Sequence, residues 1–463
     1  MAQLDKYKKV FFVGIGGIGM SALARFFHTS GYLVAGYDRV AGPVTEALSR
    51  EGILVFFDAS EQVIPADFVS AEDTLVVYTP AVPETQSQLV WFRKEGFDVF
   101  KRSRVLGMVT ESLNAVCVAG THGKTTVSTI TAFLFHNSSL KINAFLGGIS
   151  KNFGTNFIGS KDADFVVLEA DEFDRSFWQL TPYAALITSM DADHLDIYGS
   201  IDEVKAGFDG FAQRIKSNGW LVLKAGLPVP EGLADNVEVI SYSITRDASY
   251  QAINIKEEGD GFTFDVETPS GRLNNFRLTI PGLINVENAL GAITLSLLCG
   301  VTEDEIRKGL PQFSGIARRF DVVFRNAGRF VYIDDYAHHP EEIRATLKSV
   351  RSAYPQCRIT GVFQPHLYSR TRDFADGFAE TLAGGLDDVI LLPVYPAREE
   401  PIPGISSELI LEKISGTKVC LSSKEDLLEN IERLNPEVLV TMGAGDIDRL
   451  VPVIRKWAEE TKG

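Results

Sequence analysis

The sequence predicts an α/β fold with three domains and mainly parallel sheets. Short apolar strand patterns alternate with helical patterns along most of the chain, as in βαβ units. Glycine-rich turns join a strand to a helix at residues 14–19 and again at residues 120–125. The 463 residues also exceed what one hydrophobic core holds. We place the domains at residues 1–107, 108–312 and 313–463.

The first domain has a Rossmann-like order of elements, in which a strand, a glycine-rich turn and a helix are followed by further strands. Its expected strands are residues 9–13, 32–37 and 75–78, with a helix at residues 20–29. The third domain repeats this α/β alternation. Pro340 is expected at the first position of one of its helices. Its expected strands are residues 330–333, 358–363, 389–392 and 438–442.

The central domain combines a P-loop ATPase-like pattern with a different stretch near its end. Its expected strands are residues 115–118, 165–168 and 184–188, with helices at residues 124–135 and 286–298. Between residues 219 and 281 apolar residues alternate with period two, and residues 262–266 and 276–280 flank a Pro-Ser-Gly turn. We therefore expect an added antiparallel β stretch there.

Composition and charge narrow the class of protein. The chain is 45% apolar and 23% charged, with a net charge of −16, which argues against nucleic-acid or anionic-membrane binding. Its four cysteines lie far apart, and no apolar run reaches the length of a membrane span. We expect a soluble cytoplasmic protein with no nucleic-acid partner and no membrane insertion.

The first glycine-rich turn has the GxGxxG spacing of a diphosphate-binding turn. Its glycines are Gly14, Gly16, Gly17 and Gly19. Backbone N–H groups and a helix N-terminus at such a turn bind a diphosphate, and Asp38 ends the next strand, where it suits a ribose hydroxyl or a base. By pattern alone NAD or FAD is the commonest ligand, and the turn does not name it.

The second turn, Gly120-Thr121-His122-Gly123-Lys124-Thr125, indicates a variant phosphate-binding loop. In such a loop Lys124 neutralises the β- and γ-phosphates of a nucleotide, and the hydroxyl of Thr125 binds Mg²⁺. The general Walker pattern would require its first glycine at Val118, so this loop is not of the general type.

Charged residues follow several expected strands, at the sheet edge where α/β proteins bind ligands. Acidic residues or histidines occur in the segments 169–172, 191–196, 334–340 and 364–371. Glu169 directly follows a strand and suits Mg²⁺. His194 follows the next strand, where a metal or substrate role is expected. The pair Arg318-Arg319 suits a phosphate or a carboxylate, because a guanidinium binds either group with two hydrogen bonds.

Taken together, these motifs resemble the Mur ligases, three-domain enzymes of peptidoglycan precursor synthesis. The matching motifs are Gly-Thr-His-Gly-Lys-Thr, Glu-Ala-Asp-Glu at 169–172, Asp-His-Leu-Asp at 193–196, Asn-Val-Glu-Asn-Ala at 285–289, Arg-Arg-Phe at 318–320 and Asp-Asp-Tyr-Ala-His-His-Pro at 334–340. The resemblance spans essentially the whole chain. Residues 14–24, His122, residues 363–366 and residues 395–404 resemble the alanine-adding branch.

The resemblance implies an ATP-dependent ligation of L-alanine to the lactyl carboxylate of UDP-N-acetylmuramate. An acyl phosphate is the intermediate, ADP and phosphate are products, two Mg²⁺ sites are expected, and the protein is a monomer or a weak homodimer. The implied UDP-sugar residues are Gly14, Gly16, Gly17, Gly19, Asp38, Thr79 and Ala81. The implied ATP residues are Gly120, Thr121, His122, Gly123, Lys124, Thr125, Thr126, Asn285, Asn288, Arg319 and Asp335.

Three further sets of residues follow from the same resemblance. The metal ligands are Thr125, Glu169 and His194, and the amino acid is bound by His338, His366 and Arg370. The catalytic residues are Lys124, His194, Arg319 and His338. Two positions depart from the family pattern: Ile284 stands where a histidine is frequent, and Leu367 where a basic residue is frequent. The second departure leaves Arg370 as the expected partner of the alanine carboxylate.

Three other functions are consistent with parts of this pattern. One is a recycling ligase of the same superfamily that attaches a whole tripeptide to the same sugar. The others are an NAD-dependent dehydrogenase and a nucleotide-regulated binding protein. The segments 363–371 and 395–404 favour a single alanine over the tripeptide.

Overall fold

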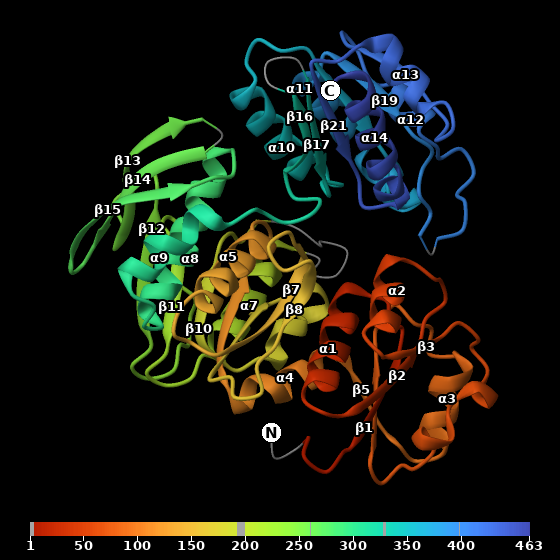
Figure 1. Cartoon of the computed structure of the whole chain (residues 1–463), viewed down its shortest axis with the longest axis vertical. Helices are drawn as coiled ribbons and strands as arrows, with labels where there is room; N and C mark the ends of the chain where they lie inside the picture. Colours follow the sequence, from red (N-terminus) through yellow and green to blue (C-terminus); the bar gives the residue numbers. More distant parts are fainter. Residues whose placement is uncertain (1–3, 192–199, 260, 327–329, 398) are drawn as a thin grey trace. The chain divides into compact units, whose positions relative to one another are not determined.

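The structure is a computed structural model that describes residues 4–191, 200–259, 261–326, 330–397 and 399–463. The chain forms two compact units, of which one holds residues 1–280 and 285–314 and the other holds residues 281–284 and 315–463. Figure 1 labels the helices and strands. In the described ranges, no helix is both long and apolar enough to cross a membrane.

The first sheet is parallel, with the strand order β3-β2-β1-β4-β5. Its strands are β1 Lys9–Val13, β2 Leu33–Tyr37, β3 Leu54–Phe56, β4 Thr74–Tyr78 and β5 Asp98–Lys101. Its helices are α1 Ile18–Thr29, α2 Pro43–Arg50, α3 Ser87–Lys94 and α4 Arg102–Ser112, with short 3₁₀ turns at Glu61–Val63 and Ala66–Phe68. The central strand β1 is apolar and almost fully buried, as a strand covered on both faces must be.

The second sheet has the order β15-β14-β13-β12-β11-β10-β6-β9-β7-β8. Its strands are β6 Asn114–Ala119, β7 Ile142–Ser150, β8 Thr155–Ile158, β9 Phe165–Glu169, β10 Pro182–Ile187, β11 Trp220–Lys224, β12 Glu238–Ser243, β13 Tyr250–Glu258, β14 Gly261–Thr268 and β15 Gly271–Leu278. The accompanying helices are α5 Lys124–His136, α7 Ile201–Ala212, α8 Leu283–Leu298 and α9 Glu303–Gly309, with 3₁₀ turns at Phe173–Gln179 and Leu310–Gln312.

The antiparallel stretch expected between residues 219 and 281 is only partly correct. The pairs β13–β14 and β14–β15 are antiparallel, and the Pro-Ser-Gly turn connects the second pair as expected. The strands β11 and β12 instead continue the parallel sheet, since β10–β11, β11–β12 and β12–β13 are all parallel. Period-two alternation reports burial of one face of a strand and carries no information on strand direction, which explains the error.

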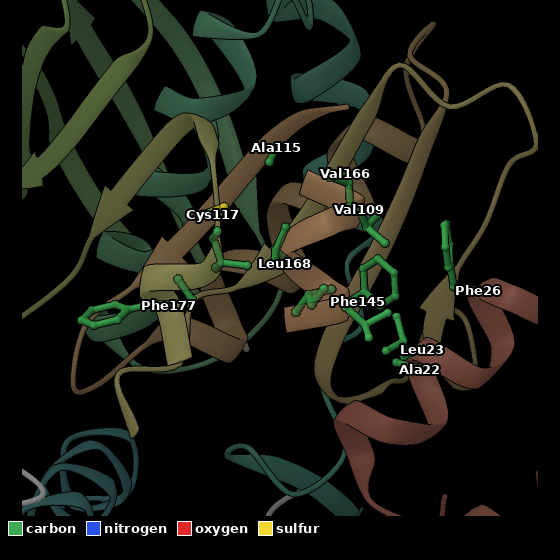
Figure 2. Packing of buried hydrophobic residues seen from close by; sticks show 14 of the residues in the cluster. Ala22, Leu23, Phe26, Val109, Ala115, Cys117, Phe145, Val166, Leu168 and Phe177 are labelled. Atoms are coloured by element: carbon green, nitrogen blue, oxygen red, sulfur yellow. The ribbon is translucent and has the colours of Figure 1, made fainter. Parts of the chain in front are cut away.

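A continuous core joins the first sheet to the second within one compact unit. Helix α1 packs against β7 and β8. The ring of Phe26 on this helix lies 5.5 Å from Phe145 and 6.2 Å from Phe157, measured between centroids, and Figure 2 shows Phe26 and Phe145 among the buried residues. Arg25 donates to Asn156 Oδ1 at 2.5 Å and forms a two-bond ion pair with Glu51. The first two domains therefore share a hydrophobic interior.

The third sheet has the order β16-β17-β21-β18-β19-β20, parallel except for the antiparallel pair β16–β17. Its strands are β16 Asp321–Asn326, β17 Phe330–Asp335, β18 Ile359–Phe363, β19 Asp388–Leu391, β20 Lys418–Leu421 and β21 Val438–Met442. Its helices are α10 Pro340–Ala353, α11 Tyr368–Gly385, α12 Glu408–Leu411, α13 Leu427–Leu434 and α14 Val451–Thr461, with a 3₁₀ turn at Asp446–Leu450. Pro340 begins α10, as expected.

Candidate active site

The first glycine-rich turn is built at the common edge of three parallel strands. Val13 pairs with Tyr37 on one side and with Tyr78 on the other, so that Asp38 and Thr79 follow their strands at the level of the turn. The backbone N–H of Gly16 donates to Asp38 Oδ2 at 2.7 Å. The carboxylate of Asp38 therefore stabilises the conformation of the turn.

Close contacts explain two of the glycines in this turn. Gly14 has a φ of +90°, and a Cβ added there would lie 2.7 Å from Cγ2 of Thr79. A Cβ added at Gly16 would lie 2.8 Å from Asp38 Oδ2. Thr79 therefore lies beside the turn, and its Oγ1 accepts a hydrogen bond from the backbone N–H of Ala81 at 3.4 Å. The helix α1 begins directly after Gly17.

The second turn occupies the corresponding place between β6 and α5. Gly120 has a φ of +126° and Gly123 a φ of +81°, and a Cβ at Gly120 would lie 2.1 Å from Thr188 Oγ1. Since Ala119 pairs with Ile187, the residue after β10 is Thr188, and its hydroxyl bonds the carbonyl oxygens of Ala119 and His122. Only glycine permits this approach of the two strand ends.

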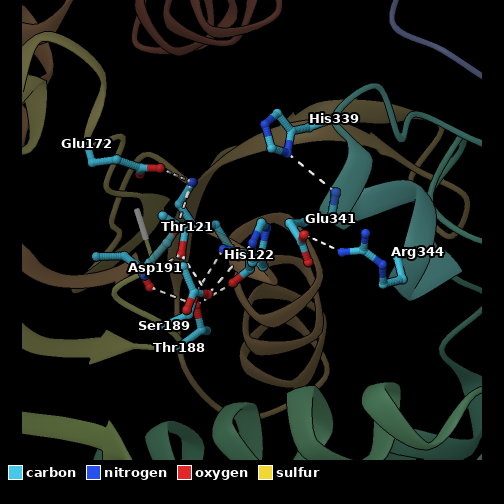
Figure 3. A network of polar contacts seen from close by, with 12 residues as sticks. Thr121, His122, Glu172, Thr188, Ser189, Asp191, His339, Glu341 and Arg344 are labelled. Carbon is cyan, nitrogen blue, oxygen red and sulfur yellow. Dashed lines mark hydrogen bonds and ion pairs between the residues drawn. The ribbon is translucent and has the colours of Figure 1, made fainter. Parts of the chain in front are cut away.

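Polar side chains after β10 hold the loop in place, as Figure 3 shows. The hydroxyl groups of Thr121 and Ser189 lie 2.8 Å apart, and Ser189 Oγ accepts from the backbone N–H of His122 at 3.0 Å. His122 Nε2 lies 3.7 Å from Asp191 Oδ2, on an exposed side of the loop. Thr188 was expected as the last residue of the strand and Ser189 as the residue after it, and neither was predicted as a site residue.

Lys124 is held by two acceptors rather than extended into solvent. Its Nζ donates to the carbonyl oxygen of Gly120 at 2.7 Å and to Glu172 Oε1 at 2.8 Å. Burial lowers the pKa of Lys124, but the charges of Glu172, Asp171 and Glu169 outweigh it and raise that pKa above its ordinary value. Burial raises the pKa of Glu172, although the lysine opposes this effect. The sequence analysis assigned no role to Glu172.

Glu169 ends β9 beside the phosphate loop, since it pairs with Val118 of β6. Its Oε1 accepts from the backbone N–H of Gly147 at 3.1 Å. Thr125 is buried in the first turn of α5, and Asn288 on α8 lies close to the loop, because a Cβ at Gly123 would meet Asn288 Oδ1 at 2.9 Å. Asn288 Nδ2 also donates to Asn285 Oδ1 at 3.4 Å.

A cavity of about 280 Å³ lies between the start of α1 and the end of β9. The start of α1 lines one part of it, and the carboxylates after β9 line another. Arg102, at the start of α4, contributes a guanidinium whose Nη2 lies 3.9 Å from Asp171 Oδ2. Sequence reasoning missed Arg102, because no motif surrounds it. The residues named here that line the cavity are Gly17, Gly19, Thr79, Arg102, Glu169 and Asp171.

In the second compact unit, the two adjacent arginines have different environments. Arg318 Nε donates to Asp334 Oδ2 at 3.2 Å, and its Nη2 donates to the carbonyl oxygen of Gly443. The guanidinium of Arg319 lies 5.2 Å from the centre of the Tyr336 ring. Arg318 thus connects the ends of β17 and β21, and its guanidinium lies 5.1 Å from the centre of the same Tyr336 ring.

Asp335 also has a structural role in this unit. Its Oδ2 accepts from the backbone N–H of Phe320 at 2.7 Å and its Oδ1 from that of Ala337 at 2.8 Å. Phe320 and Arg318 both have positive φ angles, of 45° and 63°. Such angles are costly for these residues, so the buried carboxylate maintains a strained loop at the site.

Three histidine and tyrosine rings lie together beyond the ends of β17, β18 and β19. The rings of His338 and His366 are 6.0 Å apart, and His366 stacks on Tyr395 at 5.8 Å. Leu367 has a φ of +69° and its backbone N–H donates to the carbonyl oxygen of Tyr395 at 2.9 Å. Arg370 lies in the first turn of α11, half-buried. His194 lies outside the residues that the structure describes.

These features are typical of nucleotide-dependent α/β enzymes, in which a glycine-rich turn joins a strand to the helix that follows it. Domain models of one family match the chain at residues 9–112 (Mur ligase family, catalytic domain), 118–296 (Mur ligase middle domain) and 318–445 (Mur ligase, glutamate ligase domain). The chain belongs to the Mur ligase family.

Relatives of known name cover nearly the whole chain. The UDP-N-acetylmuramate–L-alanine ligase of Parabacteroides distasonis is 47% identical over 98% of this chain and 98% of its own length. The enzyme of that name from Flavobacterium johnsoniae is 44% identical and covers 99% of both chains.

Two solved structures have the same overall fold. The UDP-N-acetylmuramate–alanine ligase of Thermotoga maritima matches with a TM-score of 0.81 and 26% identity, covering 98% of this chain and 99% of that one. A murein peptide ligase from Psychrobacter arcticus matches with a TM-score of 0.70 over 98% of this chain and 99% of its own. At 22% identity, the second likeness bears on the fold alone.

Proposed function

We propose that this enzyme joins L-alanine to the lactyl carboxylate of UDP-N-acetylmuramate and converts ATP to ADP and phosphate. Relatives with that name are 47% and 44% identical across almost the entire chain. The GxGxxG turn then serves a sugar nucleotide, and membership of a ligase family replaces the NAD-dependent dehydrogenase as an interpretation of it.

The cavity between the start of α1 and the end of β9 supports this proposal. It is lined by the N-terminus of α1 and also by Glu169, beside the phosphate loop. A sugar nucleotide with its diphosphate at α1 would therefore extend its carboxylate toward the site of phosphoryl transfer. The positive end of α1 and the guanidinium of Arg102 favour an anionic ligand in this space, although the whole chain is acidic.

The first step is transfer of the γ-phosphoryl group of ATP to the lactyl carboxylate. Phosphorylation is needed because a free carboxylate repels a nucleophile and has no good leaving group. In the proposed assignment, Lys124 leaves Glu172 and neutralises phosphate oxygens, and Arg319 supplies a second positive charge. Residues 120–126, Asn285 and Asn288 are the proposed nucleotide-binding residues of the first compact unit, and Arg319 and Asp335 are those of the second.

The side chains of Thr125 and Glu169 suit Mg²⁺, because hydroxyl and carboxylate oxygens are its usual protein ligands and phosphates supply the others. Glu169 lines the cavity, and Gly147 leaves room for its carboxylate, since a Cβ there would lie 2.2 Å from Glu169 Oε1. A bound Mg²⁺ would reduce the negative charge of the transferring phosphoryl group. We propose two such sites and assign His194 to the second.

In the second step the amine of L-alanine attacks the acyl phosphate and displaces phosphate. We assign His338, His366 and Arg370 to the amino acid, with Arg370 as the partner of its carboxylate. All three lie beyond strand ends of the third sheet, with His338 and His366 in ring contact. Exclusion of water from the acyl phosphate is the remaining requirement, because hydrolysis would waste ATP.

The decisive experiment measures phosphate release from ATP with UDP-N-acetylmuramate and one amine acceptor at a time. The acceptors are L-alanine, L-serine, glycine and the murein tripeptide. Release that requires both the sugar nucleotide and L-alanine is expected. Release with the tripeptide and none with alanine would assign the chain to recycling, and slow hydrolysis independent of both would indicate a nucleotide-regulated binding protein.

We further propose domain boundaries near residues 107 and 312, a cytoplasmic location and a monomer or weak homodimer. The four cysteines are free thiols, which suits a reducing compartment. Neither nucleic acid nor a membrane is proposed as a partner, given the net charge of −16. Sedimentation equilibrium over a range of concentrations tests the oligomeric state.

A further inference from the structure

Glu342 makes three contacts with the segment that carries His338, all through one oxygen. Its Oε2 lies 3.1 Å from Nδ1 of His338, 2.9 Å from the backbone N of His338 and 3.2 Å from the backbone N of His339. Glu342 is the third residue of α10, so that its carboxylate caps the helix N-terminus. The same carboxylate thus serves the helix and the imidazole ring.

The contacts of Nδ1 show which ring nitrogen of His338 carries the hydrogen. Nδ1 also lies 3.0 Å from the carbonyl oxygen of Tyr336. A carbonyl oxygen and an ionised carboxylate only accept hydrogen bonds, so Nδ1 must carry a hydrogen. Burial raises the pKa of Glu342, but hydrogen bonds from the His338 ring and backbone outweigh it and keep that pKa well below its usual range. The carboxylate is ionised, and in the Nδ1–H tautomer of His338 the free electron pair is on Nε2.

We propose that Glu342 and His338 form a carboxylate–histidine dyad, in which Glu342 is a positioning residue that presents Nε2 of His338 as the base for the incoming amine. This inference rests on the proposed ligase function. It adds an orienting carboxylate to the histidine, as the third member of a catalytic triad orients its base.

The proton transfer accompanies a balanced displacement. The electron pair of the alanine nitrogen forms the new C–N bond to the acyl carbon. The C–O bond to the phosphate breaks, and its electron pair leaves with the phosphate. The surplus proton on nitrogen passes to Nε2 of His338, and the resulting imidazolium is stabilised by the carboxylate of Glu342.

Other charged and titratable groups surround the dyad. Arg319 and Asp335 act electrostatically on Glu342, and the rings of Tyr336 and His366 lie 5.3 Å and 6.0 Å from that of His338. Within the part of the chain that the structure describes, Nδ1 of His338 contacts the carbonyl oxygen of Tyr336 and the carboxylate of Glu342. Removal of the charge at residue 342 is therefore the specific way to test the dyad.

The test compares Glu342→Gln with Glu341→Gln. A glutamine at residue 342 still accepts hydrogen bonds from the helix N-terminus, but it removes the charge. Glu341 is the matched control, because it lies on the same helix, is exposed and pairs with Arg344. We expect Glu342→Gln to lower kcat for ligation by about tenfold to a hundredfold, the range of a weakened general base, while Glu341→Gln stays close to wild type.

Two readouts separate positioning from a purely structural role. The acidic limb of the pH profile should move to lower pH in Glu342→Gln, because the imidazolium loses the carboxylate that stabilises it. Isotope exchange within ATP, measured with the sugar nucleotide and without alanine, reports acyl phosphate formation and should stay within about twofold of wild type. An unchanged acidic limb, or an equal loss in both half-reactions, would overturn the proposal.

A measurement on the wild-type enzyme needs no variant to fold. Nitrogen-15 spectra of histidine-labelled protein report which ring nitrogen of His338 carries the hydrogen. The Nδ1–H form is expected, and the Nε2–H form would exclude the dyad. Wild-type enzyme that shows no alanine-dependent phosphate release would instead contradict the proposed function, so the two failures are distinguishable.

Discussion

Nζ of Lys124 lies 2.8 Å from Oε1 of Glu172, and both side chains are largely removed from water. The side chain of Glu172 is 3% exposed and that of Lys124 is 17% exposed. A buried ion pair of this kind contributes little net stability, but loss of one partner leaves an uncompensated charge. Lys124, which we propose binds phosphate, is therefore also a structural residue.

Lys124→Ala is expected to abolish ligation and also to destabilise the fold. The loss of activity follows from the missing charge at the phosphates, and the destabilisation, about 3 kcal/mol, follows from isolating Glu172. The double variant Lys124→Ala/Glu172→Gln should recover most of the stability and none of the activity. Chemical denaturation and the phosphate-release assay measure the two effects. Full stability of the single variant would show that the pair has no structural role.

Gly120→Ala should disrupt the phosphate loop, because its Cβ would lie 2.1 Å from Thr188 Oγ1 on a backbone with φ of +126°. We expect kcat/KM for ATP to fall on the order of 100-fold or more, since a displacement near 1 Å has that effect. Gly154→Ala is the control: its φ is +65°, but no atom lies within 4 Å of the added Cβ. It should cost about 1 kcal/mol of stability without a change in activity. Equal effects of the two substitutions would contradict this account.

Asp38→Ala should raise KM for UDP-N-acetylmuramate by about tenfold with little change in kcat. The turn loses its hydrogen bond to Gly16 N, and an interaction with a charged group of this kind contributes about 1.5 kcal/mol or more. Asp38→Asn retains an acceptor and should have a smaller effect. Steady-state kinetics with the sugar nucleotide varied provide the measurement. A fall in kcat alone would place Asp38 in the chemical step instead.

Asp334 should give the stability of the third domain a specific pH dependence. Burial raises its pKa to about 6 from an ordinary value of 3.8, although Arg318 opposes this rise. Since the folded pKa lies above the unfolded one, the contribution of Asp334 to stability is largest below pH 3.8 and is lost as the pH rises toward 6.

Asp334→Asn removes this titration. The free energy of unfolding of the variant minus that of wild type should therefore be larger at pH 7 than at pH 5, by about 1 kcal/mol. Urea denaturation of both proteins at the two pH values tests this, because other titrating groups cancel in the comparison. A difference of the opposite sign would mean that Arg318 lowers the pKa of Asp334 overall.

Much of the fold was predictable because it depends on local patterns. The strand at Lys9–Val13, the helix starting at Lys124 and the strand at Val438–Met442 were placed to within a residue or two. The direction of β11 and β12 was not, since strand pairing is decided by contacts between distant segments. The shared core of the first two domains was not predicted either, because it depends on contacts between segments that are distant in the sequence.

The candidate site shows the same division. Glycines with positive φ and residues directly after strands were predictable, because turn geometry and strand ends have local signals. Glu172 and Arg102 were missed as functional residues, since their positions depend on how β9 and α4 pack beside the loop. Glu342 had a usable signal, as the third residue after a helix cap, but its contact with a ring nitrogen required the structure.

The packing of Phe26 against Phe145 and Phe157, with the Arg25–Asn156 hydrogen bond, has a consequence for substrate length. These contacts keep the start of α1 at a constant separation from the end of β9, where Glu169 lies. In the binding mode that we propose, a sugar nucleotide spans that separation between its diphosphate and its carboxylate. We therefore expect sugar nucleotides with a shorter or longer acid side chain to bind and yet react poorly, because their carboxylate would not lie at the phosphoryl donor.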